Sequence, residues 1–253
     1  MKILITGATG AIGKEIACLL ASKGHDIILG CRSKKKGEIL AEEIEFIYGK
    51  RPGIVIIDLS DASSVSRASN HLSGECLDAI INNAGVMNGK YILDGDGHED
   101  TLNVNYHNTR LLTELLIDRI NDGGAVVFTT SATRRWYPFQ RLNDDIPESK
   151  FGRLKTYALS KKLITRYAAA IASDKDLQKR SIRINCADPG VVDTPMLSMG
   201  RWFDRLTDIF FRPFCLKPST AAKTSVRALE SPKSGYIFLS PLGKTRNKKK
   251  LDL

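Results

Sequence analysis

KILITGATGAIG, residues 2–13, joins a short apolar run to a turn that contains three glycines. The run Lys2–Thr6 predicts a buried strand, and the apolar spacing after the turn predicts an amphipathic helix over Ile12–Lys23. Gly7, Gly10 and Gly13 would allow a pyrophosphate to approach the helix N-terminus, where free N–H groups and the helix dipole favour anions. A plain strand–helix turn is the alternative. Between the first strand and the first helix of a βαβ unit, the motif favours dinucleotide binding.

Six further apolar runs alternate with helix-period segments along the chain. Strands that are apolar throughout and separated by helices indicate a parallel sheet covered on both faces. The sequence therefore predicts an α/β fold, a single-domain Rossmann-type doubly wound parallel sheet of about seven strands over residues 1–240, with ligands beyond the carboxyl ends of the strands. The later predicted strands are Asp26–Gly30, Gly53–Ile57, Leu77–Ile81, Gly124–Thr130, Ser181–Cys186 and Gly235–Leu239.

The 253-residue chain has a formal net charge of +10, part of which lies in residues 241–253, expected to form a basic, disordered tail. A positive chain suits nucleic acid, an anionic membrane or a phosphate-rich cofactor, but no arginine-rich or zinc-finger pattern favours nucleic acid. The five cysteines lack C-x-x-C spacing, which argues against disulfides and a metal site and favours a reducing compartment. Residues 1–6 leave no room for a signal peptide and no apolar run could cross a membrane, so we expect a cytoplasmic protein.

The residues after the second predicted strand indicate which cofactor is bound. An NAD site usually places Asp or Glu there to hold the ribose hydroxyls. This chain instead has Arg32, within Gly30-Cys31-Arg32-Ser33, followed by Lys34–Lys36. A guanidinium suits a 2′-phosphate through bidentate, charge-assisted hydrogen bonds. We interpret the lysines as the solvated start of a helix and Arg32 as an indication of NADP(H).

Polar residues recur where the other predicted strands end. Asp58 follows the third strand, Asn82–Gly85 (N-N-A-G) follows the fourth, and Ser131 follows the fifth, with Asn105 in the helix between the last two. The carboxyl ends of parallel strands meet at one edge of a sheet, so these residues would lie near one ligand.

Tyr157 and Lys161 complete the set as Y-x-x-x-K, a spacing that puts both side chains on one helix face. Alone the pair would be ordinary helix surface. Together the motifs resemble the short-chain dehydrogenase/reductase family over residues 1–240, in particular its roughly 250-residue branch. Gly30-Cys31-Arg32, Asn103-Val104-Asn105-Tyr106 and the long spacing from Ser131 to Tyr157 resemble its retinol dehydrogenase and protochlorophyllide reductase subgroup.

The resemblance implies a role for each of these residues. Tyr157 would be the catalytic acid/base, and Lys161 would bind the nicotinamide ribose and lower the pKa of the tyrosine through its charge. Ser131 would donate a hydrogen bond to the substrate oxygen, and Asn105 would hold a water. Asp58 would contact adenine, and the P-G-x-x-x-T motif would lie against the nicotinamide. The predicted cofactor-binding residues are Gly7, Thr9, Gly10, Ala11, Ile12, Gly13, Arg32, Asp58, Leu59, Asn83, Ala84, Gly85, Tyr157, Lys161, Pro189, Gly190, Val192 and Thr194.

The glycine motif departs from the family pattern at one position. The pattern T-G-x-x-x-G-x-G has glycine at its sixth position, where this chain has Ala11, and Gly10 stands at the fifth. That spacing is typical of the extended branch, which contains sugar-nucleotide epimerases. N-N-A-G is present and a large C-terminal substrate domain is absent, so we interpret Ala11 as a local variant in the pyrophosphate turn.

Two long segments are expected near the substrate: a loop over residues 196–216 and the polar connection Ala132–Thr156. Their aromatic residues predict an apolar or mixed pocket, and packing of a loop helix onto the core is the alternative. These residues are Trp136, Tyr137, Phe139, Trp202, Phe203, Phe210, Phe211 and Phe214.

The predicted function is that of an NADP(H)-dependent oxidoreductase, passing a hydride between nicotinamide and the carbonyl or alcohol group of a small molecule. A catalytically idle NADP(H)-binding regulatory protein is the alternative, although Tyr157, Lys161 and Ser131 are all present. Membrane association through the basic tail and the 200–215 stretch is a weaker hypothesis, and a homo-oligomer stays open. Proteins of one fold differ widely in what they reduce, so the sequence names no substrate.

Overall fold

The computed structural model describes residues 1–95, 97–136, 144–192, 215–240 and 248–250. Its strands are β1 (Lys2–Thr6), β2 (Asp26–Cys31), β3 (Gly53–Ile56), β4 (Leu77–Asn82), β5 (Ile120–Thr129), β6 (Arg183–Asp188), β7 (Tyr236–Leu239) and β8 (Lys248–Lys250). Its α-helices are α1 (Ala11–Ala21), α2 (Lys34–Tyr48), α3 (Ala62–His71), α4 (Asp100–Leu102), α5 (Asn108–Leu116), α6 (Arg153–Ala172), α7 (Lys175–Lys179) and α9 (Pro218–Glu230). The shorter turns are the π-helix η1 (Asn103–His107) and the 3-10 helices η2 (Ile117–Arg119), η3 (Ala132–Trp136) and η4 (Glu148–Lys150).

The described strands form one sheet in the order β3-β2-β1-β4-β5-β6-β7-β8. Pairing is parallel from β3 through β7, which confirms the predicted doubly wound sheet and its seven parallel strands. The strand order reverses at β1, which lies between β2 and β4. In sheets of this kind the crevice beyond the carboxyl ends at the reversal is the usual ligand site.

Strand β8 was not foreseen from the sequence. Lys248–Lys250 pair antiparallel with Tyr236–Phe238 of β7, although these lysines fall within the tail expected to be disordered. These three residues therefore differ from the expected disordered tail. They pair with the edge of β7, whose backbone N–H and C=O groups are available to a further strand. Residues 241–247 and 251–253 lie outside the described part of the chain.

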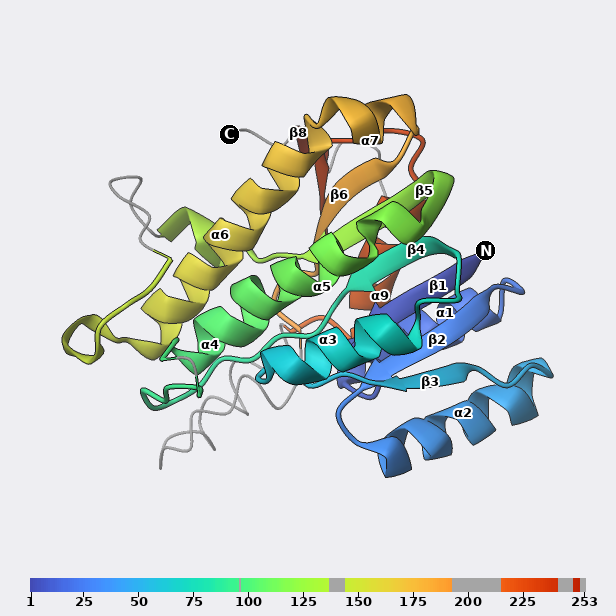
Figure 1. Cartoon of the computed structure of the whole chain (residues 1–253), viewed down its shortest axis with the longest axis horizontal. Helices are drawn as coiled ribbons and strands as arrows, with labels where there is room; N and C mark the ends of the chain where they lie inside the picture. The colour runs from blue at the N-terminus through green and yellow to red at the C-terminus, as the bar shows by residue number, and fades with distance from the viewer. Residues whose placement is uncertain (96, 137–143, 193–214, 241–247, 251–253) are drawn as a thin grey trace.

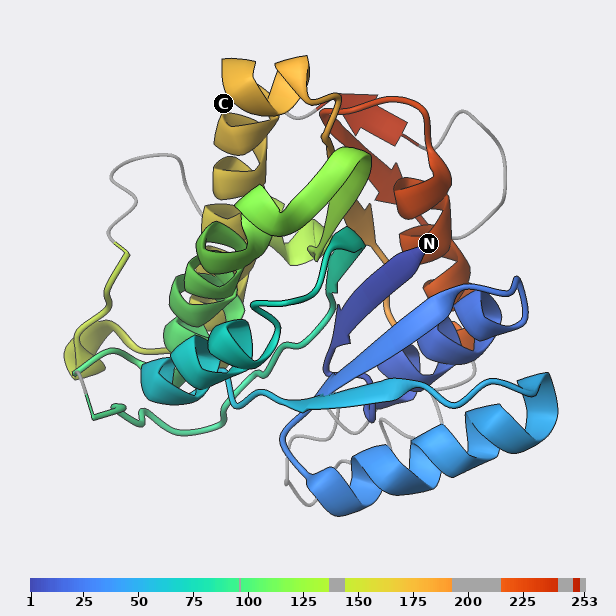
Figure 2. The same cartoon turned by 45° about the vertical axis from the view of Figure 1, so that its right-hand side comes forward.

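Helices cover both faces of the sheet (Figures 1 and 2). Side chains alternate along each strand, so Leu4 of β1 packs with α3, α5 and α6 on one face, while Ile3 and Ile5 pack with α1, α2 and α9 on the other. Each face buries a large apolar cluster, which accounts for strands that are apolar throughout. The sheet is therefore held rigidly from both sides, and its carboxyl edge is free to carry a site.

Some boundaries differ from those expected. β5 begins at Ile120 rather than Gly124, because residues 121–124 form an irregularity in its pairing with β4, with Gly123 at φ +79°. Helix α1 ends at Ala21, two residues before the predicted end, and α6 begins at Arg153, inside the segment expected to be a loop. Most of the predicted substrate loop, including residues 196–214, lies outside the described residues, as do Tyr137 and Phe139.

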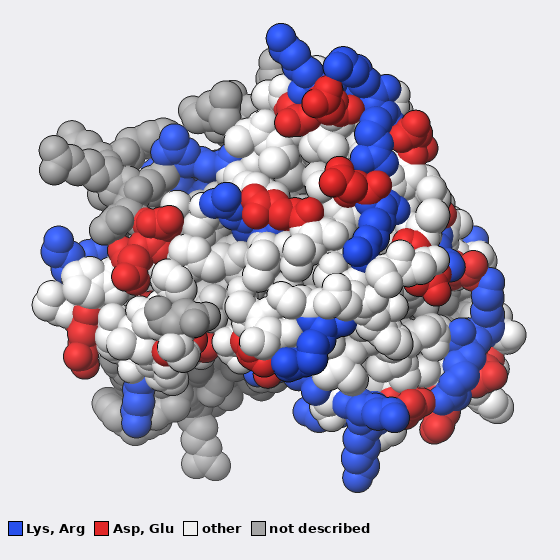
Figure 3. Space-filling model, in the orientation of Figure 1, with Lys and Arg blue, Asp and Glu red and all other residues white. Residues whose placement is uncertain are grey.

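Two observations concern the hypothesis of membrane association: the distribution of surface charge and the length of the helices. On the face covered by α3, α5 and α6, basic and acidic side chains are intermingled (Figure 3). Among the described residues, no helix combines the length and apolarity needed to cross a bilayer.

Gly13 sets how closely α1 packs on the end of β1. A Cβ at this position would overlap the Gly7 carbonyl oxygen and lie 2.9 Å from both Ala8 Cα and Asn83 Nδ2. The first turn of α1 therefore rests directly on the glycine turn and on β4, and only glycine fits there.

Replacing Gly13 with Ala should lower the free energy of unfolding by roughly 1–3 kcal/mol, because the backbone must shift to admit the methyl group. Gly74→Ala is the control, since a Cβ at Gly74 would meet nothing within 4 Å, and its effect should stay within about 0.5 kcal/mol. Urea unfolding followed by circular dichroism measures both. Equal stability of the two variants would contradict this account of the turn.

Candidate functional site

The glycine turn is tied to β4 by hydrogen bonds from two sides. The Thr6 hydroxyl oxygen accepts the backbone N–H groups of Asn83 and Ala84, each at 3.1 Å. The Asn83 side chain donates in return to the carbonyls of Thr6 (3.0 Å) and Gly7 (3.3 Å). Gly7 has φ +62°, and a Cβ there would lie 2.9 Å from Ala84 Cα. The crevice between β1 and β4 is thus a fixed, glycine-lined cradle.

The N-terminus of α1 opens into this cradle. The N-cap residue Gly10 has no side chain to occupy the first N–H groups of the helix, and Ala11 is the exposed first residue. Free N–H groups at a helix start suit a pyrophosphate. Because the Ala11 methyl group is at the surface, alanine at the sixth motif position is compatible with the turn. Thr9 and Ile12, the other predicted residues of the turn, are partly buried.

Arg32 lies at the same edge of the sheet. It directly follows β2. Within β2, Gly30 is the register partner of Thr6, and the Gly30 carbonyl accepts the Ala8 N–H at 3.1 Å. The Arg32 side chain is exposed, and within the described part of the chain it forms no ion pair. The guanidinium is therefore available to an anionic group bound over the glycine turn.

Asp58 and Leu59 follow β3, the next strand along the edge. The Asp58 carboxylate accepts hydrogen bonds from the Ser60 N–H (3.0 Å) and hydroxyl (2.7 Å). The Leu59 side chain is buried in the core, and the Leu59 carbonyl accepts from Asn108 Nδ2 at 2.9 Å. Both residues were predicted to contact the cofactor. The Asp58 side chain is partly exposed, whereas the Leu59 side chain is buried.

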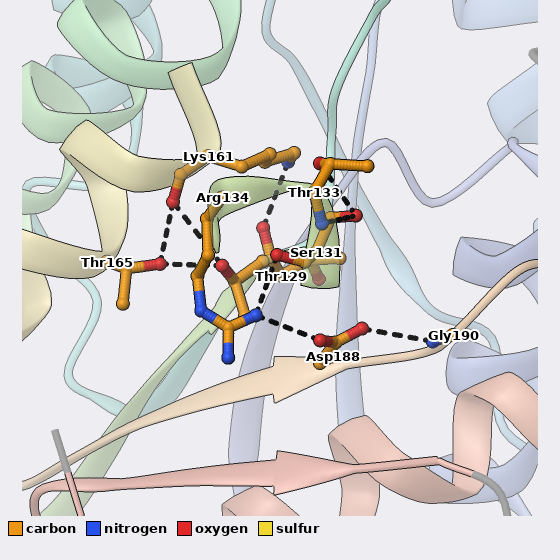
Figure 4. A network of polar contacts seen from close by, with 9 residues as sticks. Thr129, Ser131, Thr133, Arg134, Lys161, Thr165, Asp188 and Gly190 are labelled. Atoms are coloured by element: carbon orange, nitrogen blue, oxygen red, sulfur yellow. Dashed lines mark hydrogen bonds and ion pairs between the residues drawn. The ribbon is translucent and has the colours of Figure 1, made fainter. Parts of the chain in front are cut away.

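The structure brings the predicted catalytic residues together. Ser131 lies beside the Tyr157 hydroxyl, as a hydrogen-bonding neighbour that acts to lower the pKa of the tyrosine. Lys161 Nζ lies 5.7 Å from the centroid of the Tyr157 ring and donates to the Thr129 carbonyl at 2.9 Å (Figure 4). A Cβ on Gly85 would lie 3.2 Å from both Lys161 Nζ and Asn105 Oδ1, so the N-N-A-G segment passes directly over this group.

Asn105 sits in the π-helical turn η1, a form of helix often found at functional sites. Its Nδ2 donates to the Val86 carbonyl (2.8 Å) and to Ser160 Oγ (3.0 Å), and its Oδ1 accepts the Val86 N–H (2.8 Å). The Asn105 side chain therefore joins the segment after β4 to α6. Protein groups take both hydrogens of its amide, so the expected water would have to donate to an oxygen of this residue.

The pKa of Tyr157 differs in direction from the sequence expectation. Burial raises the pKa of its hydroxyl to about 12, against the opposing hydrogen bond from Ser131, and the charge of Asp188 raises it further. Burial likewise lowers the pKa of the Lys161 ammonium to about 8, opposed by Cys186 and Asp188. In this arrangement Tyr157 is protonated at neutral pH, as a proton donor must be.

An ion pair missed from the sequence lies behind Ser131. Arg134 Nη1 contacts Asp188 Oδ2 at 2.9 Å, with both side chains buried (Figure 4). Asp188 Oδ1 also accepts the Gly190 N–H at 3.2 Å. In the sequence, the pair is visible only as two opposite charges close to the ends of β5 and β6. These charges can be recognised as a pair only when β5 and β6 are known to be neighbours.

The last predicted motif follows β6. Pro189 is buried, and Gly190 has φ +77°, with Leu216 Cδ1 3.0 Å from where a Cβ would lie. The buried Val192 pairs with Leu216 in an isolated bridge. Thr194 lies outside the described residues. Pro189 and Gly190 thus reach the same edge as Ser131, since β5 and β6 are adjacent.

A separate hollow of about 850 Å³ lies at the opposite edge of the sheet, near the starts of β6 and β7 and the end of α6. Its lining includes Arg183, Ser234 and Ala172 and none of the predicted site residues. The chemistry is therefore assigned to the carboxyl edge, where the polar groups converge.

Replacing Lys161 with Met should make stability depend on pH in a defined way. The folded pKa of Lys161, about 8, lies below the unfolded value near 10.4, so the unfolded state binds more protons between these values. The wild type should therefore gain about 2 kcal/mol relative to Lys161→Met as pH rises from 7 to 9.5. Unfolding in urea across this range measures the difference, with the exposed Lys155→Met as control. A difference that does not change with pH would contradict the burial of the ammonium.

Comparisons with known proteins identify the family of this chain. A family model described as short chain dehydrogenase matches residues 1–142. Retinol dehydrogenase 12 of Homo sapiens is 33% identical over 245 residues, covering 93% of this chain and 76% of that protein. Polyprenol dehydrogenase of Mus musculus is 28% identical over 238 residues, covering 90% of this chain and 71% of that protein.

Solved structures share the fold. A short chain dehydrogenase of Shigella flexneri complexed with NADP superposes with a TM-score of 0.72 at 23% identity, covering 94% of this chain and 95% of that one. A short-chain dehydrogenase of Sphingobium yanoikuyae in complex with NADPH gives 0.73 at 19% identity, covering 95% and 88%. On the family model and the sequence relatives, the chain belongs to the short-chain dehydrogenase/reductase family of oxidoreductases, in its retinol dehydrogenase-like subgroup.

Proposed function

We propose that this chain is an NADP(H)-dependent oxidoreductase that interconverts a carbonyl and an alcohol on a small molecule. The observation that carries the proposal is the position of Ser131 beside the Tyr157 hydroxyl, with Lys161 near the same ring and the glycine cradle across the crevice. A proton donor, a second hydroxyl for the substrate oxygen and a dinucleotide cradle thus share one edge of the sheet.

The residues present fit a dinucleotide. Cβ atoms at Gly7 and Gly13 would collide with neighbouring backbone, so these glycines let α1 and the segment after β4 pack closely on the turn. This close packing brings the N-terminus of α1 to the crevice where a pyrophosphate would bind. Arg32 offers a cation where a 2′-phosphate would lie, and residues 26–37 contain one acidic residue, Asp26, at the far end of β2. This charge pattern favours NADP(H) over NAD(H). Two solved structures that share the fold are complexed with NADP and NADPH.

A bound dihydronicotinamide would supply the hydride for carbonyl reduction. The Tyr157 hydroxyl would donate its proton to the carbonyl oxygen as that oxygen gains negative charge. Ser131 would hydrogen-bond the same oxygen and so stabilise the charge. Lys161, whose pKa burial lowers to about 8, would bind the ribose and return a proton toward the tyrosine. With its pKa raised by burial, Tyr157 is protonated at neutral pH and can act as this donor.

An apolar carbonyl compound is the substrate class that we favour. Trp136 and Val191, which follow Ser131 and Gly190, are 67% and 62% exposed at this edge of the sheet. Two of the relatives are named for retinol and polyprenol. Among the described residues, which include all five cysteines, no disulfide forms, and the proposal includes a cytoplasmic location.

Replacing Tyr157 with Phe should reduce carbonyl turnover by about 10²-fold or more while NADPH binding stays within about threefold, because only the acid/base hydroxyl is lost. Lys161→Met should weaken both turnover and binding. NADPH oxidation with a panel of aldehydes, ketones and quinones, followed by absorbance, measures the first effect, and fluorescence titration measures the second. Near-wild-type turnover by Tyr157→Phe would refute the assignment. No turnover by the wild type across the panel would favour the regulatory alternative.

Replacing Arg32 with Asp should weaken NADPH binding by roughly ten- to a hundredfold, because a charge-assisted contact contributes on the order of 1.5–3 kcal/mol. NADH binding should be equal or tighter, since the new carboxylate can accept from the ribose hydroxyls. Lys35→Asp makes the same charge change at an exposed helix residue and should have a small, salt-screened effect. Dissociation constants for both cofactors at fixed salt measure this. An Arg32→Asp protein that still prefers NADPH would refute the role of Arg32.

A further inference from the structure

The ion pair between Arg134 and Asp188 lies behind the catalytic residues and has no part in the chemistry proposed above. Arg134 is in η3, directly after Ser131, and Asp188 is the last residue of β6. Their side chains are only 7% and 5% exposed. Burial of two charges costs free energy unless the charges are paired and hydrogen-bonded, and a well-packed apolar pair is often as stable. Stability alone therefore does not explain a buried ion pair at the end of this strand.

Arg134 binds the backbone of the residue that meets Tyr157. Its Nη1 donates to the Ser131 carbonyl at 2.6 Å while also contacting Asp188 Oδ2 at 2.9 Å (Figure 4). The Arg134 backbone N–H donates to the same carbonyl at 3.1 Å. The main chain at Ser131 is thus held by two groups of one residue, and the guanidinium connects it to β6.

Asp188 holds the turn on the other side. Its Oδ2 contacts Arg134 and its Oδ1 accepts the Gly190 N–H at 3.2 Å, so one carboxylate spans both segments. Gly190 is in the left-handed region at φ +77°, where the backbone needs support from its surroundings. The path from the Ser131 carbonyl to Gly190 consists of direct contacts, and the two side chains that make them are buried.

The same network reaches α6. The hydroxyl groups of Thr130 and Thr165 are 2.6 Å apart, and Thr165 donates to the Lys161 carbonyl at 2.6 Å. Thr130 N–H donates to the Ala187 carbonyl of β6 at 2.8 Å. The ends of β5 and β6 and the middle of α6 are therefore one connected polar unit.

We propose that Arg134 and Asp188 are positioning residues, which together fix the distance and angle between the Ser131 hydroxyl and the Pro189-Gly190 turn. The inference rests on the proposed function, in which Ser131 binds the substrate oxygen and the turn lies against the nicotinamide. Small errors in such geometry reduce the rate of a chemical step steeply. Neither side chain contacts the Tyr157 hydroxyl or acts as an acid or base in this role.

The test compares Asp188→Asn with the double variant Arg134→Met/Asp188→Asn. The single variant leaves the guanidinium buried without its counter-charge and can lose folded protein. The double variant removes both charges, so a purely structural role would leave kcat per folded molecule unchanged. The positioning role predicts instead that kcat for carbonyl reduction falls about tenfold or more in the double variant, with the NADPH dissociation constant within about threefold. Circular dichroism gives the folded fraction.

The pH profile of kcat is a second readout, which reports whether the charge of Asp188 acts on the catalytic residues. The charge of Asp188 raises the pKa values of Tyr157 and Lys161. Without that charge both pKa values fall, so the alkaline limb of kcat for reduction should move to lower pH in the double variant. Arg135→Met is the control, because Arg135 is the exposed neighbour in η3, and its pH profile should match the wild type.

The outcomes separate this proposal from the function on which it rests. An active wild type whose folded double variant retains kcat and the wild-type pH profile would overturn the positioning role alone. A wild type that reduces no carbonyl compound would overturn the proposed function and this inference together. A folded double variant with low kcat, near-normal NADPH binding and a shifted alkaline limb would support the positioning role.

Discussion

The Thr6 hydroxyl is the group on which the rest of the site depends. It accepts two N–H groups from the segment after β4, while Asn83 returns two hydrogen bonds to the carbonyls of Thr6 and Gly7. These four contacts lock the glycine turn to the neighbouring strand at the point where the strand order reverses. The closeness of α1, enforced at Gly13, follows from the same arrangement. A cradle for a dinucleotide therefore exists in the backbone itself, before any side chain recognises a ligand.

A second constraint operates on the opposite wall of the crevice. Asn105 ties the segment after β4 to α6, and α6 carries Tyr157 and Lys161. Because all of these groups are buried or partly buried, their protonation depends on burial as much as on neighbouring charges. The pKa of Tyr157 rises to about 12 and that of Lys161 falls to about 8. Both shifts favour the neutral forms and suit an acid that gives up its proton only when a substrate oxygen becomes basic.

Local sequence patterns predicted the strands and the motifs at their ends, because these features depend on residues close together in the chain. The apolar runs identified the seven parallel strands, and the glycine turn, N-N-A-G and Y-x-x-x-K fell on strand ends and one helix face. Features that depend on which strands become neighbours were missed. Arg134 and Asp188 are far apart in sequence and meet only because β5 pairs with β6. The direction of the Tyr157 pKa depends on burial, and β8 depends on the edge that β7 presents, so neither has a local signature.

The central claim is that NADPH binds across the carboxyl edge of β1 and β4 with its nicotinamide beside Tyr157. A crystal structure of the chain with NADPH tests it most directly. We predict the pyrophosphate at the N-terminus of α1, the 2′-phosphate against Arg32, and the nicotinamide between Lys161 and Gly190. NADPH bound in the hollow near the starts of β6 and β7, or with its nicotinamide turned away from Tyr157, would contradict the account.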